Sequence, residues 1–350
     1  GHSITNTVLI SYVSAAIFIT VSLLSPFLSG VADYTGNKKG FLRFFFLLGG
    51  SACMGLYFFN IEQLEISMFI YYLAGIGFWA SLVFYNAFLP EIAPLAYQDK
   101  LSAKGFSLGY LGSSILLIIC LALVMVAGMP AKWSFVITGV WWIAFGFYSI
   151  KRLKQRTLPQ TEQQHVLWKG FRELKKVWVE INQLPRLKRY LASFFTYSMG
   201  VQTIMIMAVY FGTKEITWGS EAEKTTGLIV SVLIIQFIAI GGASLLAWLS
   251  NKIGNIKALS TVLLLWCVLC ISALWVRTPL HFYIIAAFVG LVMGGVQALS
   301  RSTYSKLLPE TKDTASYFSF YDVAEKVGIV IGTFSYGFIE SLTGSMRNSI

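Results

Sequence analysis

The hydrophobic and polar positions of this chain alternate in long blocks, and the blocks predict its architecture. About ten apolar runs reach the roughly 20 residues that a helix needs to cross a bilayer. In the first half the runs lie near residues 8–30, 41–60, 66–89, 105–128 and 131–150. The second half repeats the plan near 190–212, 226–249, 256–276, 280–300 and 315–340. The pattern predicts an all-α, polytopic membrane protein.

Two short fragments recur at nearly one offset, which indicates a duplicated chain. Asp33 is followed three residues later by Gly36, and 218 residues further on Asn251 is followed in the same way by Gly254. The tripeptide Leu-Pro-Glu that starts at Leu89 occurs again after 219 residues. We therefore expect two halves of five spans each, which correspond to spans two to eleven of an expected twelve.

The halves divide the chain into an N-terminal helical bundle (1–150), a cytoplasmic linker (151–187) and a C-terminal helical bundle (188–350). In the linker, large apolar residues recur at steps of four and three with basic residues between them, and Pro185 follows. This pattern predicts an amphipathic helix in the inner membrane interface, ended by Pro185. A docking helix for a soluble partner is the alternative. The apolar positions are Leu167, Phe171, Leu174, Trp178 and Ile181.

The net charge of +11 comes from 27 Lys and Arg against 16 Asp and Glu, and its distribution follows the loops. Every second loop is basic, and these loops together hold 21 of the 27 basic residues. This is the positive-inside bias, which places 31–40, 90–104 and 151–187 in the cytoplasm. We therefore expect contacts with lipid headgroups and no nucleic-acid partner. In a bacterium the membrane would be the inner one.

Charged residues inside a bilayer are costly, and the last apolar run carries Asp322, Glu325 and Lys326. Asp322 and Lys326 are four residues apart and can pair on one helix face. One interpretation is a substrate- or proton-binding group in which an acid titrates beside the Lys326 counter-charge. The other is a structural ion pair buried between helices.

Neutral polar residues within spans give a weaker signal. Amide and hydroxyl side chains bind ligands, and they also bridge neighbouring helices. They include Asn86, Gln202, Thr203 and Gln297. Glycines at helical spacing predict close helix packing at 105, 109 and 112 and again at 290, 294 and 295. The spans hold no histidine and the chain has no phosphate-binding loop, so we expect neither an enzyme nor a cofactor.

The segment from Asp33 through Gly36 to Lys39 resembles the loop between helices two and three of the major facilitator superfamily. It departs from that pattern at Ser29, where glycine is usual, and at Asn37, where a base is usual. Further fragments are similar to the vacuole-effluxer branch, which contains the autophagy-related amino-acid effluxers and bacterial relatives. These fragments are 85–91, 105–112 and 294–302 with 318–322.

The resemblance implies a major facilitator fold, in which two pseudo-symmetric bundles open a central site alternately to each side. It implies a secondary transporter of a small solute, with an amino acid and proton coupling as the expectation. We expect the protein to be a monomer. Sugars, nucleosides or drug-like cations are alternative cargoes, and a non-transporting membrane sensor or scaffold is an alternative class.

The resemblance also implies roles for individual residues. Asp33 would face the N-terminal end of the 315–340 helix, and one of Lys38, Lys39 and Arg43 would reach Glu91. With Gly36 and Arg301, these residues would form an inner-gate latch. The central cavity would be lined by Asn86, Tyr110, Gln202, Thr203, Gln297 and the Asp322 group.

Overall fold

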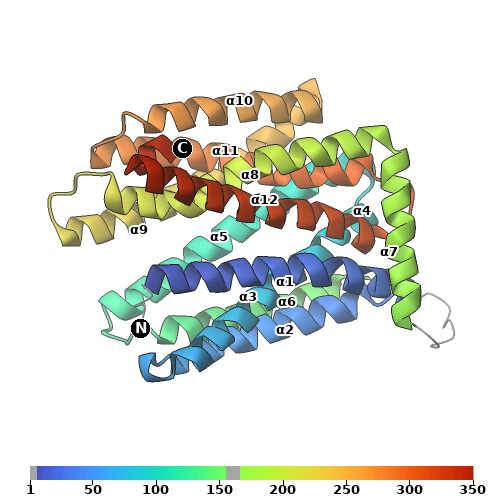
Figure 1. Cartoon of the computed structure of the whole chain (residues 1–350), viewed down its shortest axis with the longest axis horizontal. Coiled ribbons are helices and arrows are strands. Elements are labelled where there is room, and N and C mark those ends of the chain that lie inside the picture. Colours follow the sequence, from blue (N-terminus) through green and yellow to red (C-terminus); the bar gives the residue numbers. More distant parts are fainter. Residues whose placement is uncertain (1–5, 155–165, 350) are drawn as a thin grey trace. The chain divides into compact units, whose positions relative to one another are not determined.

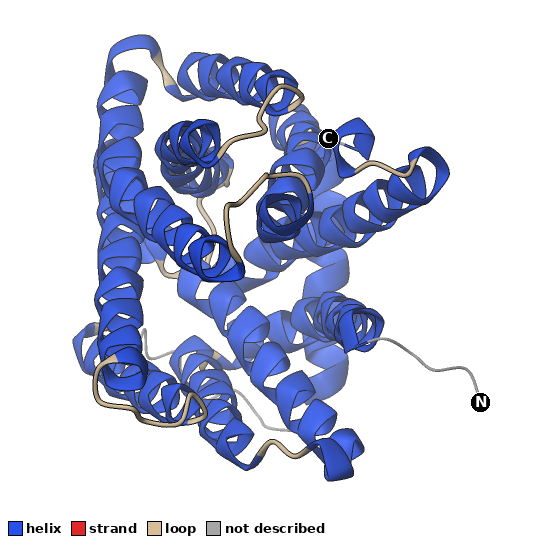
Figure 2. Ribbon diagram, turned by 90° about the vertical axis from the view of Figure 1, so that its left-hand side faces the viewer, coloured by secondary structure: helices blue, strands red, loops and turns tan. Residues whose placement is uncertain are grey.

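The computed structural model describes residues 6–154 and 166–349, and in this part of the chain the ordered elements are helices joined by short loops (Figures 1 and 2). Residues 155–165 of the predicted linker lie outside the described residues. The long helices are α1 (Asn6–Thr35), α2 (Lys38–Gly55), α3 (Leu64–Ala87), α5 (Gln98–Met125), α6 (Trp133–Arg152), α7 (Val166–Gln183), α8 (Pro185–Lys214), α9 (Glu221–Ile253), α10 (Asn255–Ala273), α11 (Pro279–Leu307) and α12 (Thr314–Thr343). The short helix α4 (Leu89–Ile92) precedes α5.

Each of the ten predicted spans falls on one of these helices, which confirms the all-α, polytopic architecture. Among the described residues, nine helices are long and apolar enough to cross a membrane. The tenth, α12, is 30 residues long but carries Asp322, Glu325 and Lys326 in its first half. The predicted runs were several residues too short at many ends, because helices continue past the apolar run into the polar interface.

Two turns at predicted boundaries have local causes. The Asn37 side chain accepts a hydrogen bond from the Gly40 amide at 3.2 Å and so caps the start of α2. Asn37 therefore serves as a helix cap where the superfamily pattern has a base. Pro185 follows the end of α7, as predicted, and is also the first residue of α8, a position where its missing amide proton costs nothing.

The chain forms two compact units. The first contains the described parts of 1–88 and 118–188 together with 308–327, and the second contains 89–117, 189–307 and the described part of 328–350. Helices α5, α8 and α12 each contribute residues to both units. The division into bundles at 1–150 and 188–350 stays a prediction.

Glycines set the closest helix crossings in the first unit. A Cβ at Gly77 of α3 would collide with the backbone of Gly49 in α2, and one at Gly30 of α1 would collide with the Gly170 carbonyl in α7. Figure 1 shows α7 running across the C-terminal end of α1. Such small residues allow the backbones to approach directly.

The second unit has a similar close crossing between α9 and α11. A Cβ at Gly290 or Gly294 would meet the α9 backbone at Ile235 or Ala239. The predicted packing role is therefore confirmed for this pair. It is wrong for Gly109 and Gly112 of α5, where an added Cβ has no neighbour within 4 Å among the described residues.

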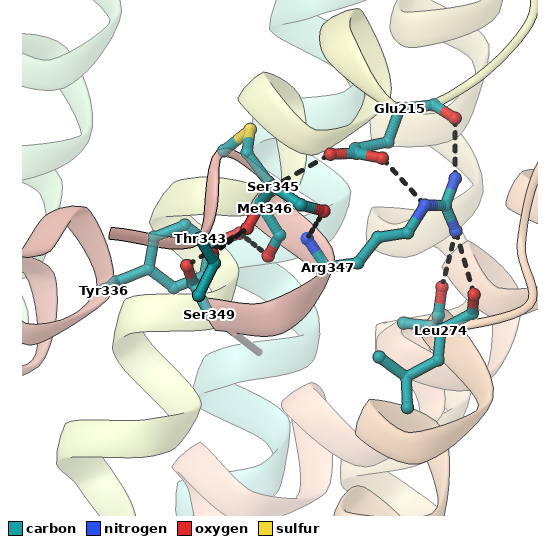
Figure 3. Close-up of polar contacts among 9 residues, drawn as sticks. Glu215, Leu274, Tyr336, Thr343, Ser345, Met346, Arg347 and Ser349 are labelled. Atoms are coloured by element: carbon teal, nitrogen blue, oxygen red, sulfur yellow. Dashed lines mark hydrogen bonds and ion pairs between the residues drawn. The ribbon is translucent and has the colours of Figure 1, made fainter. Parts of the chain in front are cut away.

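The end of the described chain is also fixed in the second unit (Figure 3). Arg347 donates to the Glu215 carboxylate at 2.7 Å and to the Glu215 backbone oxygen at 2.7 Å. Its remaining donors reach the carbonyl oxygens of Ala273 at 3.2 Å and Leu274 at 3.1 Å. One planar guanidinium thus ties the short helix at Met346–Ser349 to the ends of α8 and α10.

We predict that Gly294→Ala lowers the melting temperature of the purified protein, whereas Gly109→Ala leaves it nearly unchanged. Both substitutions add the same methyl group within a helix, but only the first forces it against a neighbouring backbone, at a cost of about 1–3 kcal/mol. Thermal unfolding in detergent measures the difference. Equal melting temperatures for the two variants would contradict the close α9–α11 crossing.

Candidate functional site

The three charged residues of α12 form one buried cluster in the first unit. Lys326 is fully buried and pairs with Asp322, while its Nζ lies 3.5 Å from a Glu325 oxygen. The same Nζ lies 4.4 Å from the centre of the Trp79 ring of α3, which adds a cation–π contact. The charges therefore lie between helices, and the predicted pairing of Asp322 with Lys326 on one helix face is confirmed.

The second carboxylate oxygen of Asp322 makes this cluster unusual. Asp322 is 3% exposed, and its Oδ2 has no hydrogen-bond partner among the described residues. Buried polar atoms usually have at least one partner, because desolvation without compensation is costly. The cluster therefore holds an acceptor that a proton or a ligand donor could satisfy.

A second cluster joins the start of α12 to the end of α1, also within the first unit. The Asp33 carboxylate accepts hydrogen bonds from the backbone amides of Ala315 at 3.2 Å and Ser316 at 2.6 Å. Free amides and the positive end of the helix dipole favour an anion at this place. The contact that the resemblance implies for Asp33 is therefore present.

Lys38 completes the Asp33 cluster. Its Nζ donates to Thr314 Oγ1 at 2.7 Å and to the Lys312 carbonyl at 3.3 Å, and it lies 3.5 Å from Asp33. Lys38 is only 9% exposed. Gly36 adopts a φ of 66°, the left-handed conformation that turns the chain from α1 into α2.

The other predicted latch residues have different surroundings. Lys39 donates to the Leu153 carbonyl at 3.0 Å, beyond the C-terminal end of α6. Arg43 is exposed on α2. Glu91 lies in α4 of the second unit, and its pairing with Lys38, Lys39 or Arg43 stays a prediction.

Arg301 binds within the second unit. It is buried, and its Nε donates to Ser102 Oγ at 3.0 Å and its Nη2 to the Ser102 carbonyl at 3.1 Å. Its guanidinium carbon lies 4.6 Å from the centre of the Phe106 ring. Arg301 therefore links α11 to the first turns of α5.

The predicted cavity residues are distributed over both units. In the second unit Tyr110 donates to Gln297 Oε1 at 2.6 Å, which joins α5 to α11. Thr203 is buried against Gly332, and its hydroxyl has no partner among the described residues. Gln202 is half-buried beside it, and Asn86 is half-buried in the first unit. Their convergence on one cavity stays a prediction.

The structure contains a further ion cluster, around Asp99, that the sequence analysis did not predict. Asp99 lies in the first turn of α5, is 2% exposed and binds Lys306 of α11 at 2.5 Å. Asn255 Nδ2 and Ser250 Oγ donate to the same carboxylate at 2.7 and 3.1 Å. All of these residues belong to the second unit.

The Asp99 cluster corresponds to the Asp33 cluster, because both join the end of one helix to the start of another. In the Asp99 cluster the acid belongs to the helix that starts, and in the Asp33 cluster it belongs to the helix that ends. Asp33 stands at the end of one helix and binds the start of another, whereas Asp99 stands at the helix start itself. Asn251, which the repeat aligned with Asp33, is exposed, and its neighbours Ser250 and Asn255 make the contacts. The duplication was the one signal that could have drawn attention to the start of α5.

Solved structures share the fold of this chain. The E. coli fucose:proton symporter FucP is 17% identical, with a TM-score of 0.66 over 96% of this chain and 86% of that one. The human organic anion transporter MFSD10 is 12% identical, with a TM-score of 0.71 over 96% and 79%. At these identities the likeness shows the fold, which is that of a major facilitator transporter.

The chain belongs to the family described as "Vacuole effluxer Atg22 like", whose profile matches residues 1–350. The "Uncharacterized MFS-type transporter YxiO" of Bacillus subtilis is 30% identical over 99% of this chain and 81% of its own length. "Autophagy-related protein 22" of Yarrowia lipolytica is 26% identical over 74% of this chain, which matches 49% of that relative's length. The protein is therefore an integral, multi-pass membrane transporter of the major facilitator type, a class that does not consist of enzymes.

We predict that Asp33→Asn and Lys38→Met are each destabilising by on the order of 3 kcal/mol, because each removes the opposite charge from a buried ion pair. The double variant should lose clearly less than the sum of the two single losses. Chemical unfolding of the purified protein in detergent measures the four free energies of the cycle.

The matched control for this cycle is Lys39→Met, because Lys39 binds the Leu153 carbonyl instead of Asp33. Its effect should add to that of Asp33→Asn without coupling. Additive losses for Asp33 and Lys38 as well would show that the two side chains do not stabilise each other.

Proposed function

We propose that this protein is a secondary active transporter that moves a small amino-acid-like solute by alternating access, with the proton as the coupling ion. The observation that carries the proposal is the buried cluster of Asp322, Glu325 and Lys326. Charged groups at membrane depth are rare, and they mark substrate and proton pathways.

The burial of Asp322 supports a proton. Asp322 is 3% exposed, and an ionised carboxylate is costly to keep in such a place, so uptake of one proton there favours the buried state. The Asp322 oxygen that lacks a partner among the described residues offers an acceptor for that proton.

The same charges support a solute that carries both signs. An amino acid presents an ammonium group for a carboxylate and a carboxylate for the Lys326 ammonium. Drug-like cations would suit acids without a neighbouring base, and sugars would not need either charge. The family description as vacuole effluxers and the fungal relatives favour export from a compartment. If the cell is bacterial, the membrane is the inner one.

The latch proposal concerns the start of α12. We propose that Asp33, Lys38 and Gly36 hold this helix start when the cytoplasmic side is closed, and that Lys39, Arg43, Glu91 and Arg301 assist. Ser316 and Asp322 lie on the same helix, about 9 Å apart along its axis at 1.5 Å per residue. Both groups therefore act on α12. If a change of charge at Asp322 shifts this helix, the shift would also separate the Ser316 amide from Asp33.

We predict that Asp322→Asn abolishes the dependence of transport on a proton gradient and lowers the driven rate by about tenfold or more. The expected loss exceeds the ~1.4 kcal/mol that corresponds to a factor of ten, because the substitution removes one carboxylate from a buried ion cluster. Uptake of labelled neutral amino acids into proteoliposomes, with and without an imposed pH gradient, measures both effects.

The matched control is Glu325→Gln, which removes the same type of charge from the partly exposed neighbour. It should retain a response to the gradient. An unchanged pH profile in Asp322→Asn would exclude Asp322 as the coupling group. Binding of the amino acid to the wild-type protein without flux would instead favour a membrane sensor.

A further inference from the structure

Helix α7 has a buried face and an opposite exposed face. Its buried face carries Val177, which is 0% exposed, and Ile181, and at Gly170 it approaches the α1 backbone at Gly30 without space for a Cβ. The sequence pattern suggested one apolar face. The structure shows that the Gly170 side of the helix packs against protein.

The exposed face combines aromatic and basic residues. At about 100° per residue, positions 168, 171, 172, 175, 178 and 179 fall on one side of the helix, opposite Gly170 and Val177. Trp168 is 74% exposed, and Arg172 and Lys175 are exposed between the aromatic residues. The members of this face are Trp168, Phe171, Arg172, Lys175, Trp178 and Val179. The described acids of α7 lie elsewhere, on its flank.

Helix α7 crosses α1 and α12 at a measurable distance from the ends of these helices. The crossing with α1 is at Gly30, five residues before that helix ends at Thr35. The ring of Trp178 lies 5.5 Å from the ring of Phe320, six residues after the start of α12. At 1.5 Å per residue, α7 crosses these helices about 8 Å from the C-terminal end of α1 and the N-terminal end of α12. It therefore packs against their sides close to these ends.

We propose that the exposed face of α7 binds the negatively charged phospholipid headgroups of the inner leaflet. Tryptophan favours the membrane interface, and Arg and Lys near the surface are attracted to anionic lipid. The face has two positive charges and, among its described side chains, no negative one. This charge complementarity favours anionic lipid over zwitterionic lipid. It also favours anionic lipid over a soluble protein whose surface carries both signs of charge.

Lipid bound to this face would also act on the start of α12. On the flank of α7, Lys176 binds Asp313 at 3.0 Å, and Glu180 accepts a hydrogen bond from Tyr317 at 2.7 Å. The hydrogen bond to Glu173, together with Asp313, raises the pKa of Lys176 and keeps it charged. Asp313 and Tyr317 flank the amides of Ala315 and Ser316 that Asp33 binds. Anionic lipid would therefore stabilise the helix end that the latch uses.

The test places a fluorescent reporter on the face. In a variant whose four cysteines are replaced by serine, Trp168→Cys is labelled with bimane and the protein is inserted into nanodiscs. We expect a blue shift when phosphatidylglycerol is added to phosphatidylcholine. In Arg172→Gln/Lys175→Gln, the fraction of phosphatidylglycerol that gives half of the shift should rise by about 25-fold or move out of reach, because each of the two bases contributes about a factor of five near an anionic surface.

The matched control is Arg172→Lys/Lys175→Arg, which keeps both charges and should keep the response. A second measurement uses the unlabelled protein in detergent, where phosphatidylglycerol should raise the melting temperature of the wild type but not of the glutamine variant. Equal spectra in both lipids, or a full response in the glutamine variant, would overturn the proposal. The same blue shift with soluble heparin in phosphatidylcholine would overturn it in favour of a polyanion. Because no transport substrate is used, failure here leaves the proposed function untouched.

Discussion

A charge that leaves water must meet an opposite charge or the end of a helix, and the described structure depends on how this chain meets that requirement. Lys326 lies between two acids and an aromatic ring. Asp33 lies at the amides that begin α12, with Lys38 beside it. Asp99 lies among Lys306 and two polar neighbours. In low dielectric each such arrangement is costly to break, so each fixes the helices that it joins.

The helices and their number could be predicted because a membrane span satisfies its own backbone hydrogen bonds. A run of apolar residues is then sufficient evidence for a helix, whatever it packs against. The pairing within α12 could be predicted for a similar reason, since spacing along one helix fixes which side chains meet. The contact of Asp33 with the start of α12 joins residues more than 280 positions apart, and it came from family resemblance.

The features that the sequence did not reveal depend on the rotation of each helix about its axis. Gly109 and Gly294 have the same spacing pattern, yet only Gly294 faces a neighbouring backbone. The repeat aligned Asn251 with Asp33, but Ser250 and Asn255 face the carboxylate of Asp99. Likewise, the apolar repeat in α7 could not separate residues that pack on α1 from aromatic residues that stay exposed. Tertiary packing decides which side of each helix faces a neighbour. The periodicity of a single sequence does not indicate that side.

The stacking of Lys326 on Trp79 has an optical consequence. Indole emission depends on the electric field across the ring, and here the positive charge of the fully buried Lys326 lies 4.4 Å from the ring centre. Any event that neutralises, moves or hydrates that ammonium alters the field at the chromophore. The charge cluster thus carries its own spectroscopic reporter, built from natural residues at the helix pair α3 and α12.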